Sequence, residues 1–111
     1  MLKTTLHCAA MLTAFIVLPV FTPQAGAEPD IAAGKQIAET QCARCHAIGR
    51  DDESALPAAP PLRTLASKWP LDVLDEAFAE GIVTGHADMP EFRFQPKQIT
   101  DLLGYIQSIS P

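Results

Sequence analysis

The stretch Cys42-Ala43-Arg44-Cys45-His46 places two cysteines three positions apart, with a histidine directly after the second. On one helical turn, positions i, i+3 and i+4 share a face, so both thiols and the imidazole project to the same side. This pattern is typical of covalent haem attachment, in which two thiols add to the porphyrin vinyl groups and the histidine ligates the iron. The motif predicts one covalent haem c, attached through Cys42 and Cys45 and ligated by His46.

A cysteine pair also has three other uses: a disulfide, a thioredoxin-like redox site and half of a zinc site. A thioredoxin-like motif follows a strand in a βαβ unit, and no strand pattern precedes Cys42. A zinc site needs a fourth protein ligand, for which only His86 is at hand. Covalent haem attachment, in contrast, belongs to proteins assembled outside the bacterial cytoplasm, and the chain begins with a segment typical of export.

The N-terminal segment has the features of a secretory signal peptide. Lys3 gives it a basic start, an apolar run extends from Ala9 to Phe21, and small residues stand at Ala25-Gly26-Ala27, where signal peptidase requires them. We therefore expect residues 1–27 to be a cleaved signal and the protein to be periplasmic.

The apolar run is shorter than the roughly 20 residues that span a bilayer, and Pro19 and Pro23 interrupt its end. No stable membrane anchor is therefore expected. The remaining residues, 28–111, are enough for one small domain, and a domain of this size gains stability from a bound group.

The predicted mature chain is acidic. Seven basic and thirteen acidic residues follow Ala27, which gives a formal charge of −6. This charge disfavours a nucleic-acid partner. It favours redox protein partners, a donor and an acceptor, that present basic docking patches.

Helical periodicity dominates the mature chain, and no strand-like alternation competes with it. Two proline- and glycine-bearing loops separate the helical patterns, and the second loop, 81–95, contains Met89. The expected fold class is all-α. Helices are predicted from Asp30 towards Cys42, around Leu62 to Lys68, from Pro70 to Gly81 and from Pro96 to Ile109.

Taken in order, these elements resemble the class I c-type cytochromes, small monohaem proteins of which this would be an exported bacterial type. The resemblance covers about residues 30–109. It rests on five features in order: a glycine in the first helix (Gly34), the C-x-x-C-H motif (Cys42 to His46), a proline-leucine element (Pro60 or Pro61 with Leu62), a methionine-proline pair (Met89-Pro90) and an aromatic residue in the last helix (Tyr105). It implies that the first and last helices cross at Gly34 and Tyr105, with the haem between the motif and the methionine loop. One departure is Ala38, where the family often has a bulky aromatic residue.

Met89 is the expected sixth ligand of the iron. It is the only methionine after Ala27, and a thioether favours reduced iron relative to a second imidazole. Elimination and the resemblance both point to it. His86 is the rival, and its ligation would give a bis-histidine centre of lower potential.

Other side chains have weaker assignments. Phe92 and Phe94 are expected to pack in the apolar surroundings of the haem. Arg63 and Trp69 could each donate to a haem propionate, but an exposed arginine and a core tryptophan are the default expectations. The acidic run from Asp51 to Glu53 is expected to be a solvated loop.

Two filled axial positions leave the iron no open site for a substrate, so an electron carrier is favoured over an enzyme. Two alternatives to a free carrier remain. In the first, the chain is a permanent cytochrome subunit of a periplasmic dehydrogenase. In the second, it is a haem protein with an open sixth site that responds to a gas or to peroxide.

Overall fold

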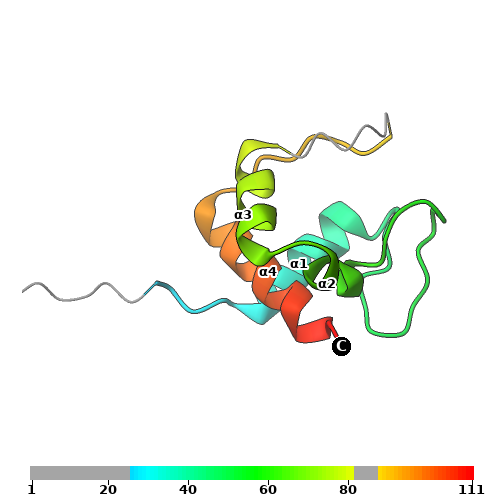
Figure 1. The fold of residues 1–111 in the computed structure, drawn as a ribbon, viewed down its shortest axis with the longest axis horizontal. Helices are drawn as coiled ribbons and strands as arrows, with labels where there is room; N and C mark the ends of the chain where they lie inside the picture. Colours follow the sequence, from blue (N-terminus) through cyan, green and yellow to red (C-terminus); the bar gives the residue numbers. More distant parts are fainter. Residues whose placement is uncertain (1–25, 82–87) are drawn as a thin grey trace, which may run out of the picture.

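The computed structural model describes residues 26–81 and 88–111, and the regular elements in these ranges are all helical. The all-α prediction is therefore confirmed. In chain order the elements are α1 (Ile31–Ile37), the π-helical turn η1 (Ala38–Cys42), the 3₁₀ turn η2 (Leu62–Thr64), α2 (Leu65–Lys68), α3 (Leu71–Glu80) and α4 (Pro96–Ile109) (Figure 1).

Local capping chemistry sets the helix ends. The Asp30 side chain accepts a first-turn N–H of α1 at 3.0 Å. Pro96 opens α4, and the Gln98 side chain accepts the Gln95 N–H at 2.9 Å. Gly81 ends α3 with φ of 98°, a conformation that side-chain-bearing residues rarely adopt. These ends agree with the boundaries that the sequence predicts.

The first and last helices cross where a glycine removes the side chain between them. A Cβ on Gly34 would lie 2.0 Å from the Asp101 carbonyl oxygen and 2.9 Å from the Tyr105 Cβ. The expected crossing at Gly34 and Tyr105 is thus confirmed. Ala38 is fully buried in the core cluster, so the position of the missing aromatic residue is filled by a small side chain.

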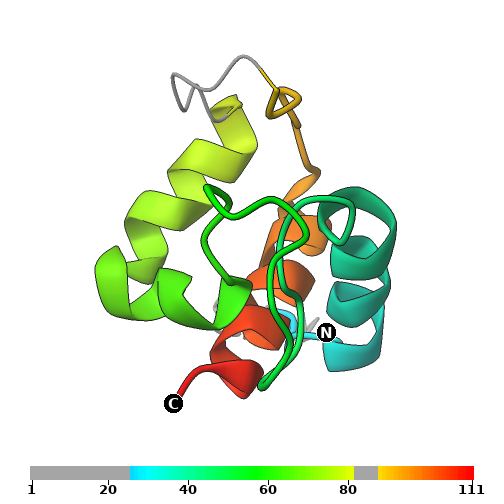
Figure 2. The same cartoon turned by 90° about the vertical axis from the view of Figure 1, so that its right-hand side faces the viewer.

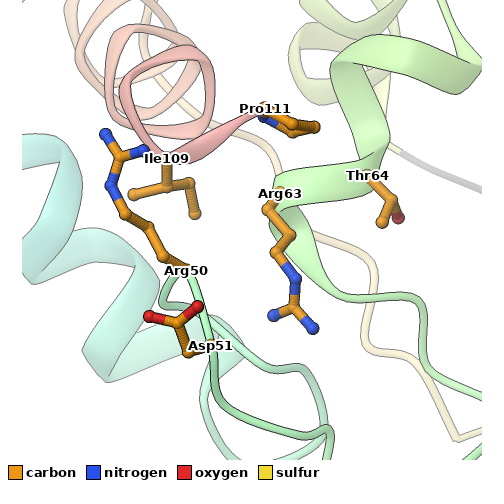
Figure 3. Close-up of a pocket in the computed structure, with 6 residues that line it drawn as sticks. All are labelled: Arg50, Asp51, Arg63, Thr64, Ile109 and Pro111. Carbon is orange, nitrogen blue, oxygen red and sulfur yellow. The ribbon is translucent and has the colours of Figure 1, made fainter.

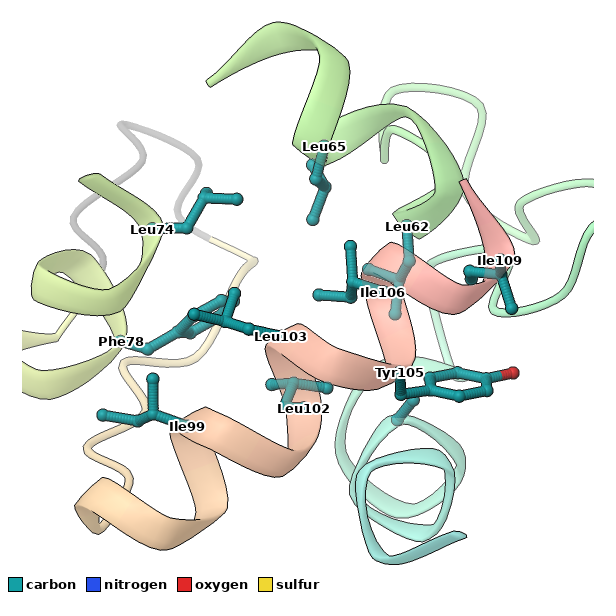
Figure 4. Packing of buried hydrophobic residues seen from close by; sticks show 11 residues of the cluster. Leu62, Leu65, Leu74, Phe78, Ile99, Leu102, Leu103, Tyr105, Ile106 and Ile109 are labelled. Atoms are coloured by element: carbon teal, nitrogen blue, oxygen red, sulfur yellow. The ribbon is translucent and has the colours of Figure 1, made fainter. Parts of the chain in front are cut away.

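The core is built around α4, which lies between α1 with η1 on one side and α2 with α3 on the other (Figure 2). Figure 4 shows Ile99 and Leu103 of α4 beside Phe78 of α3, while Tyr105 projects towards another side. The buried apolar cluster consists of Ala38, Leu62, Leu65, Leu74, Phe78, Ile99, Leu102, Leu103, Tyr105, Ile106 and Ile109.

Trp69 was expected in the core, and this expectation is wrong, because the residue is 44% exposed. Trp69 follows the last residue of α2 and has extended backbone angles, φ −134° and ψ 141°. Pro70 comes next, and a proline disfavours the helical conformation of the residue before it. The side chain therefore sits at the corner between α2 and α3 and not on a packed helix face.

Two predictions concern residues that the structure does not describe. Residues 1–25 of the expected signal, and the rival ligand His86, lie outside the described residues. Within residues 26–81 and 88–111, none of the helices has the length and apolar character that crossing a bilayer requires.

Candidate haem site

The predicted attachment motif forms one helical turn directly after η1. The N–H groups of Cys45 and His46 both donate to the Cys42 carbonyl, at 3.1 and 2.9 Å. Two residues before Cys45, the Ala43 N–H donates to the Ala38 carbonyl at 2.9 Å, the wide spacing of a π-helical turn. The structure thus brings Cys42, Cys45 and His46 together at the i, i+3 and i+4 positions that the motif requires.

The change from α to π geometry just before the motif is supported by Thr40. Its hydroxyl donates to the carbonyls of Gln36 and Ile37, at 2.9 and 3.3 Å. Such back-bonding often bends a helix. The π-helical turn therefore leads directly from α1 to the cysteine pair.

Both cysteines are free thiols and half-buried. Burial raises the pKa of the Cys42 thiol to about 11. This direction is opposite to the lowered pKa that the reactive cysteine of a thioredoxin-like pair has. The element before Cys42 is also helical and not the strand that a thioredoxin-like motif follows.

His46 is held in one orientation by a backbone carbonyl. Its Nδ1 lies 2.7 Å from the Pro60 oxygen. A carbonyl only accepts, so Nδ1 carries the hydrogen and donates it. The lone pair of Nε2 is then free for a metal, which is the usual arrangement of a ligating histidine. This donor set, two thiols and an oriented imidazole on one turn, fits a covalently attached haem.

The role of the Pro60 carbonyl was not predictable from the sequence. The resemblance marks a proline-leucine element at this place, but a backbone carbonyl has no signature of its own in a sequence. The loop is brought back to the motif by the Leu62 N–H, which donates to the Ala47 carbonyl at 2.9 Å, and by the Leu56 N–H, which donates to the Cys45 carbonyl at 3.1 Å.

Met89 lies half-buried in a turn between α3 and α4. The segment after it is attached to α3, because the Phe94 N–H donates to the Phe78 carbonyl at 3.1 Å. The Phe94 ring meets Phe78 edge-on, with 5.8 Å between centroids, and Phe92 stacks on Phe94 at 5.6 Å. Phe94 therefore packs against α3, and Phe92 packs against Phe94.

Arg63 was expected to be exposed, but its side chain is only 24% exposed. Its Nη1 donates to the carbonyls of Gly49 and Asp52, at 3.2 and 2.9 Å, and lies 3.4 Å from the Asp52 carboxylate. That carboxylate also accepts the N–H groups of Ile48 and Gly49, each at 2.9 Å. The hydrogen bonds of the Asp52 carboxylate therefore help to hold the loop together, and the residue is not only a solvated charge.

The pKa of Asp52 reflects opposing influences. Partial burial raises it, but the N–H groups of Ile48 and Gly49 and the charge of Arg63 outweigh that effect and lower the pKa below its ordinary value. The carboxylate is therefore ionised at neutral pH, and the loop keeps its ion pair.

A second set of bonds ties this loop to α4. The Tyr105 hydroxyl donates to the Ile48 carbonyl at 2.8 Å, and the Arg50 guanidinium donates to the Ser108 carbonyl. A pocket of about 370 Å³ lies beside them, lined by Arg50, Asp51, Arg63, Thr64, Ile109 and Pro111 (Figure 3). None of the predicted haem-site residues lines this pocket, so it is not the haem site.

The family model for cytochrome c matches residues 31–110, a span that contains every described helix. Comparison with the curated proteins and with the solved structures found no match. The matched family binds a covalently attached haem c, and Cys42 and Cys45 fit its attachment motif. The chain therefore belongs to the cytochrome c family, and it is a haem-binding, electron-carrying protein.

Proposed function

We propose that the chain is an exported monohaem cytochrome that carries single electrons between redox proteins in the periplasm, with His46 and Met89 as the axial ligands of its iron. The observation that carries the proposal is the bond from His46 Nδ1 to the Pro60 carbonyl, 2.7 Å long. It leaves Nε2 free on the same turn that presents two free thiols.

Four residues would hold the haem in this proposal. The sulfurs of Cys42 and Cys45 would attach the macrocycle, and the side chains of His46 and Met89 would ligate its iron. The bound haem supplies an iron that exchanges one electron at a time. With both axial positions filled by side chains, no position remains for a substrate, which favours a carrier over an enzyme.

The surface charge supports transient contact with basic partners. α3 carries four exposed acidic residues and no basic residue, and none of the four takes part in an ion pair among the described residues: Asp72, Asp75, Glu76 and Glu80. Single-sign surfaces steer complementary partners and speed encounter. Isolation of the native protein alone, and not in a stable complex, would separate a free carrier from a dehydrogenase subunit.

The segment around the expected cleavage site is compatible with removal of the signal. Residues 26–30 are exposed and have no regular structure, and the fold begins only at the capping residue Asp30. Exposed segments of this kind are the ones that peptidases cleave. The bond after Ala27 is therefore accessible without disturbing α1.

The sixth ligand is tested by the absorption spectrum of the ferric, haem-loaded protein. A methionine-to-iron bond gives a weak far-red band, so we expect the band in the parent and its loss in Met89→Ala. Asp88→Ala, at the exposed neighbouring position, is the matched control and should keep the band.

Absence of the band in the parent would contradict Met89 ligation. Two further measurements would then identify the actual arrangement. A spectral change in His86→Ala would assign the position to His86. Carbon monoxide binding to the reduced protein at neutral pH would instead indicate an open iron.

A further inference from the structure

The orientation of His46 depends on how two segments of the chain are held together. The His46 ring donates to the Pro60 carbonyl at 2.7 Å, and beside this bond the Leu62 N–H donates to the Ala47 carbonyl at 2.9 Å. Pro60 and Leu62 thus lie opposite His46 and Ala47. Any shift of one segment against the other changes the distance between Nδ1 and the carbonyl oxygen.

Arg63 joins the same two segments at a third point. It follows Leu62 directly, and its Nη1 donates to the Gly49 and Asp52 carbonyls, at 3.2 and 2.9 Å. The turn that Arg63 contacts is itself closed by hydrogen bonds, because the Asp52 carboxylate accepts the N–H groups of Ile48 and Gly49. The guanidinium therefore connects the segment of the acceptor carbonyl to the turn that follows the histidine.

We propose that Arg63 is a positioning residue for His46, which keeps the bond between Nδ1 and the Pro60 carbonyl short. The proposal rests on His46 being the iron ligand. A hydrogen bond at the far nitrogen increases the basicity of a ligating imidazole and thereby tunes the metal. A more basic imidazole stabilises ferric iron, so weakening this bond raises the reduction potential.

Arg50 provides a matched control. It lines the same pocket as Arg63 (Figure 3), but its guanidinium donates to the Ser108 carbonyl of α4 and not to either segment at His46. Arg63→Met and Arg50→Met each delete one positive charge from this pocket. Loss of a positive charge by itself lowers the reduction potential, because it favours the more positive, oxidised iron. Loss of positioning acts in the opposite direction.

We therefore expect Arg63→Met to have a higher reduction potential than Arg50→Met. The second readout is the exchange of the His46 Nδ1 hydrogen with solvent, followed by NMR in the reduced, haem-loaded protein. Exchange should be roughly fivefold faster in Arg63→Met, the factor expected when one hydrogen bond is weakened. It should match the parent in Arg50→Met.

Equal exchange rates and equal reduction potentials in the two variants would overturn the proposal. This holds even if Arg63→Met unfolds more easily than Arg50→Met, because a merely structural role of Arg63 would change only the unfolding midpoint. Should Arg63→Met fail to accumulate, Arg63→Lys and Arg50→Lys provide the same comparison with the charge kept. Faster exchange in the former supports the proposal, and equal rates refute it. The exchange readout does not depend on Met89, so failure of the sixth-ligand assignment remains distinguishable.

Discussion

Asp101 is a carboxylate buried at the crossing of α1 and α4, with only 5% of its surface exposed. Its Oδ1 accepts a bond from the Lys97 ammonium and another, 2.7 Å long, from the Asp30 N–H. The Lys97 bond and then the Asp30 bond lower the pKa of Asp101 below its ordinary value. A buried charge is tolerated when it is paired and hydrogen-bonded in this way. One side chain of α4 thus holds the residue that caps α1.

Acid should destabilise the fold through this residue. Because the pKa is lower in the folded state, the ionised carboxylate stabilises the fold above the unfolded value, 3.8. That contribution is lost as the pH falls from 3.8 through the folded-state pKa. Urea midpoints measured across this range should fall in the parent and fall less in Asp101→Asn.

Asp72→Asn is the control, because this carboxylate is exposed on α3. It should keep the acid profile of the parent. Asp52 is present in both variants, so its own lowered pKa does not affect the comparison. An unchanged profile in Asp101→Asn would contradict the assignment.

At the scale of the element, the crossing of α1 and α4 leaves no space for one added methyl group. In Gly34→Ala, the new Cβ would meet the backbone carbonyl of Asp101 at 2.0 Å. A carbonyl in the middle of α4 cannot rotate away as a side chain does. We expect a loss of about 3 kcal/mol in the free energy of unfolding, the upper end of the usual overpacking cost.

Denaturant unfolding of the haem-loaded protein measures this loss. Gln36→Ala, at an exposed position of the same helix, should change the free energy of unfolding by less than about 0.5 kcal/mol. A similarly small change in Gly34→Ala would show that α1 and α4 can move apart at little cost, which would contradict the predicted loss of stability.

The ends of two helices and the turn of the attachment motif were predictable from the sequence. The ends of α3 and α4 follow from Gly81 and Pro96, whose backbone preferences act locally. The motif turn follows from Cys42, Cys45 and His46, since their spacing matches one helical turn. These signals need no knowledge of distant parts of the chain.

The supporting contacts were not predictable, because their partners are distant and include backbone atoms. Arg63 finds its carbonyl acceptors 14 and 11 positions earlier, and no side-chain pattern marks a carbonyl. The His46 bond to Pro60 likewise spans 14 positions. Trp69 was misplaced because its hydrophobic character suggested burial, whereas Pro70 forces the chain to turn there.

At the scale of the whole molecule, net charge should govern encounter with redox partners. The predicted mature chain carries −6. Electron transfer with a cationic inorganic complex should therefore slow as salt is raised from about 0.01 to 0.15 M, because screening shortens the Debye length from roughly 30 to 8 Å. The rate with an anionic complex should increase over the same range.

Stopped-flow measurement of both rates tests this expectation. Neutralising two exposed carboxylates on α3, in Asp72→Asn/Asp75→Asn, should weaken both salt effects. The same salt dependence for the cationic and the anionic complex would show that overall charge does not steer encounter.

The contact between α1 and α4 also bears on the order in which the protein matures. The bond from the Asp30 N–H to Asp101 joins positions 71 residues apart, so the first helix has its packing partner only when the last one has emerged. In the proposed export, a chain that emerges N-terminus first could therefore close this crossing only after α4 has followed α1. Until then the two thiols of the motif would stay accessible for haem attachment.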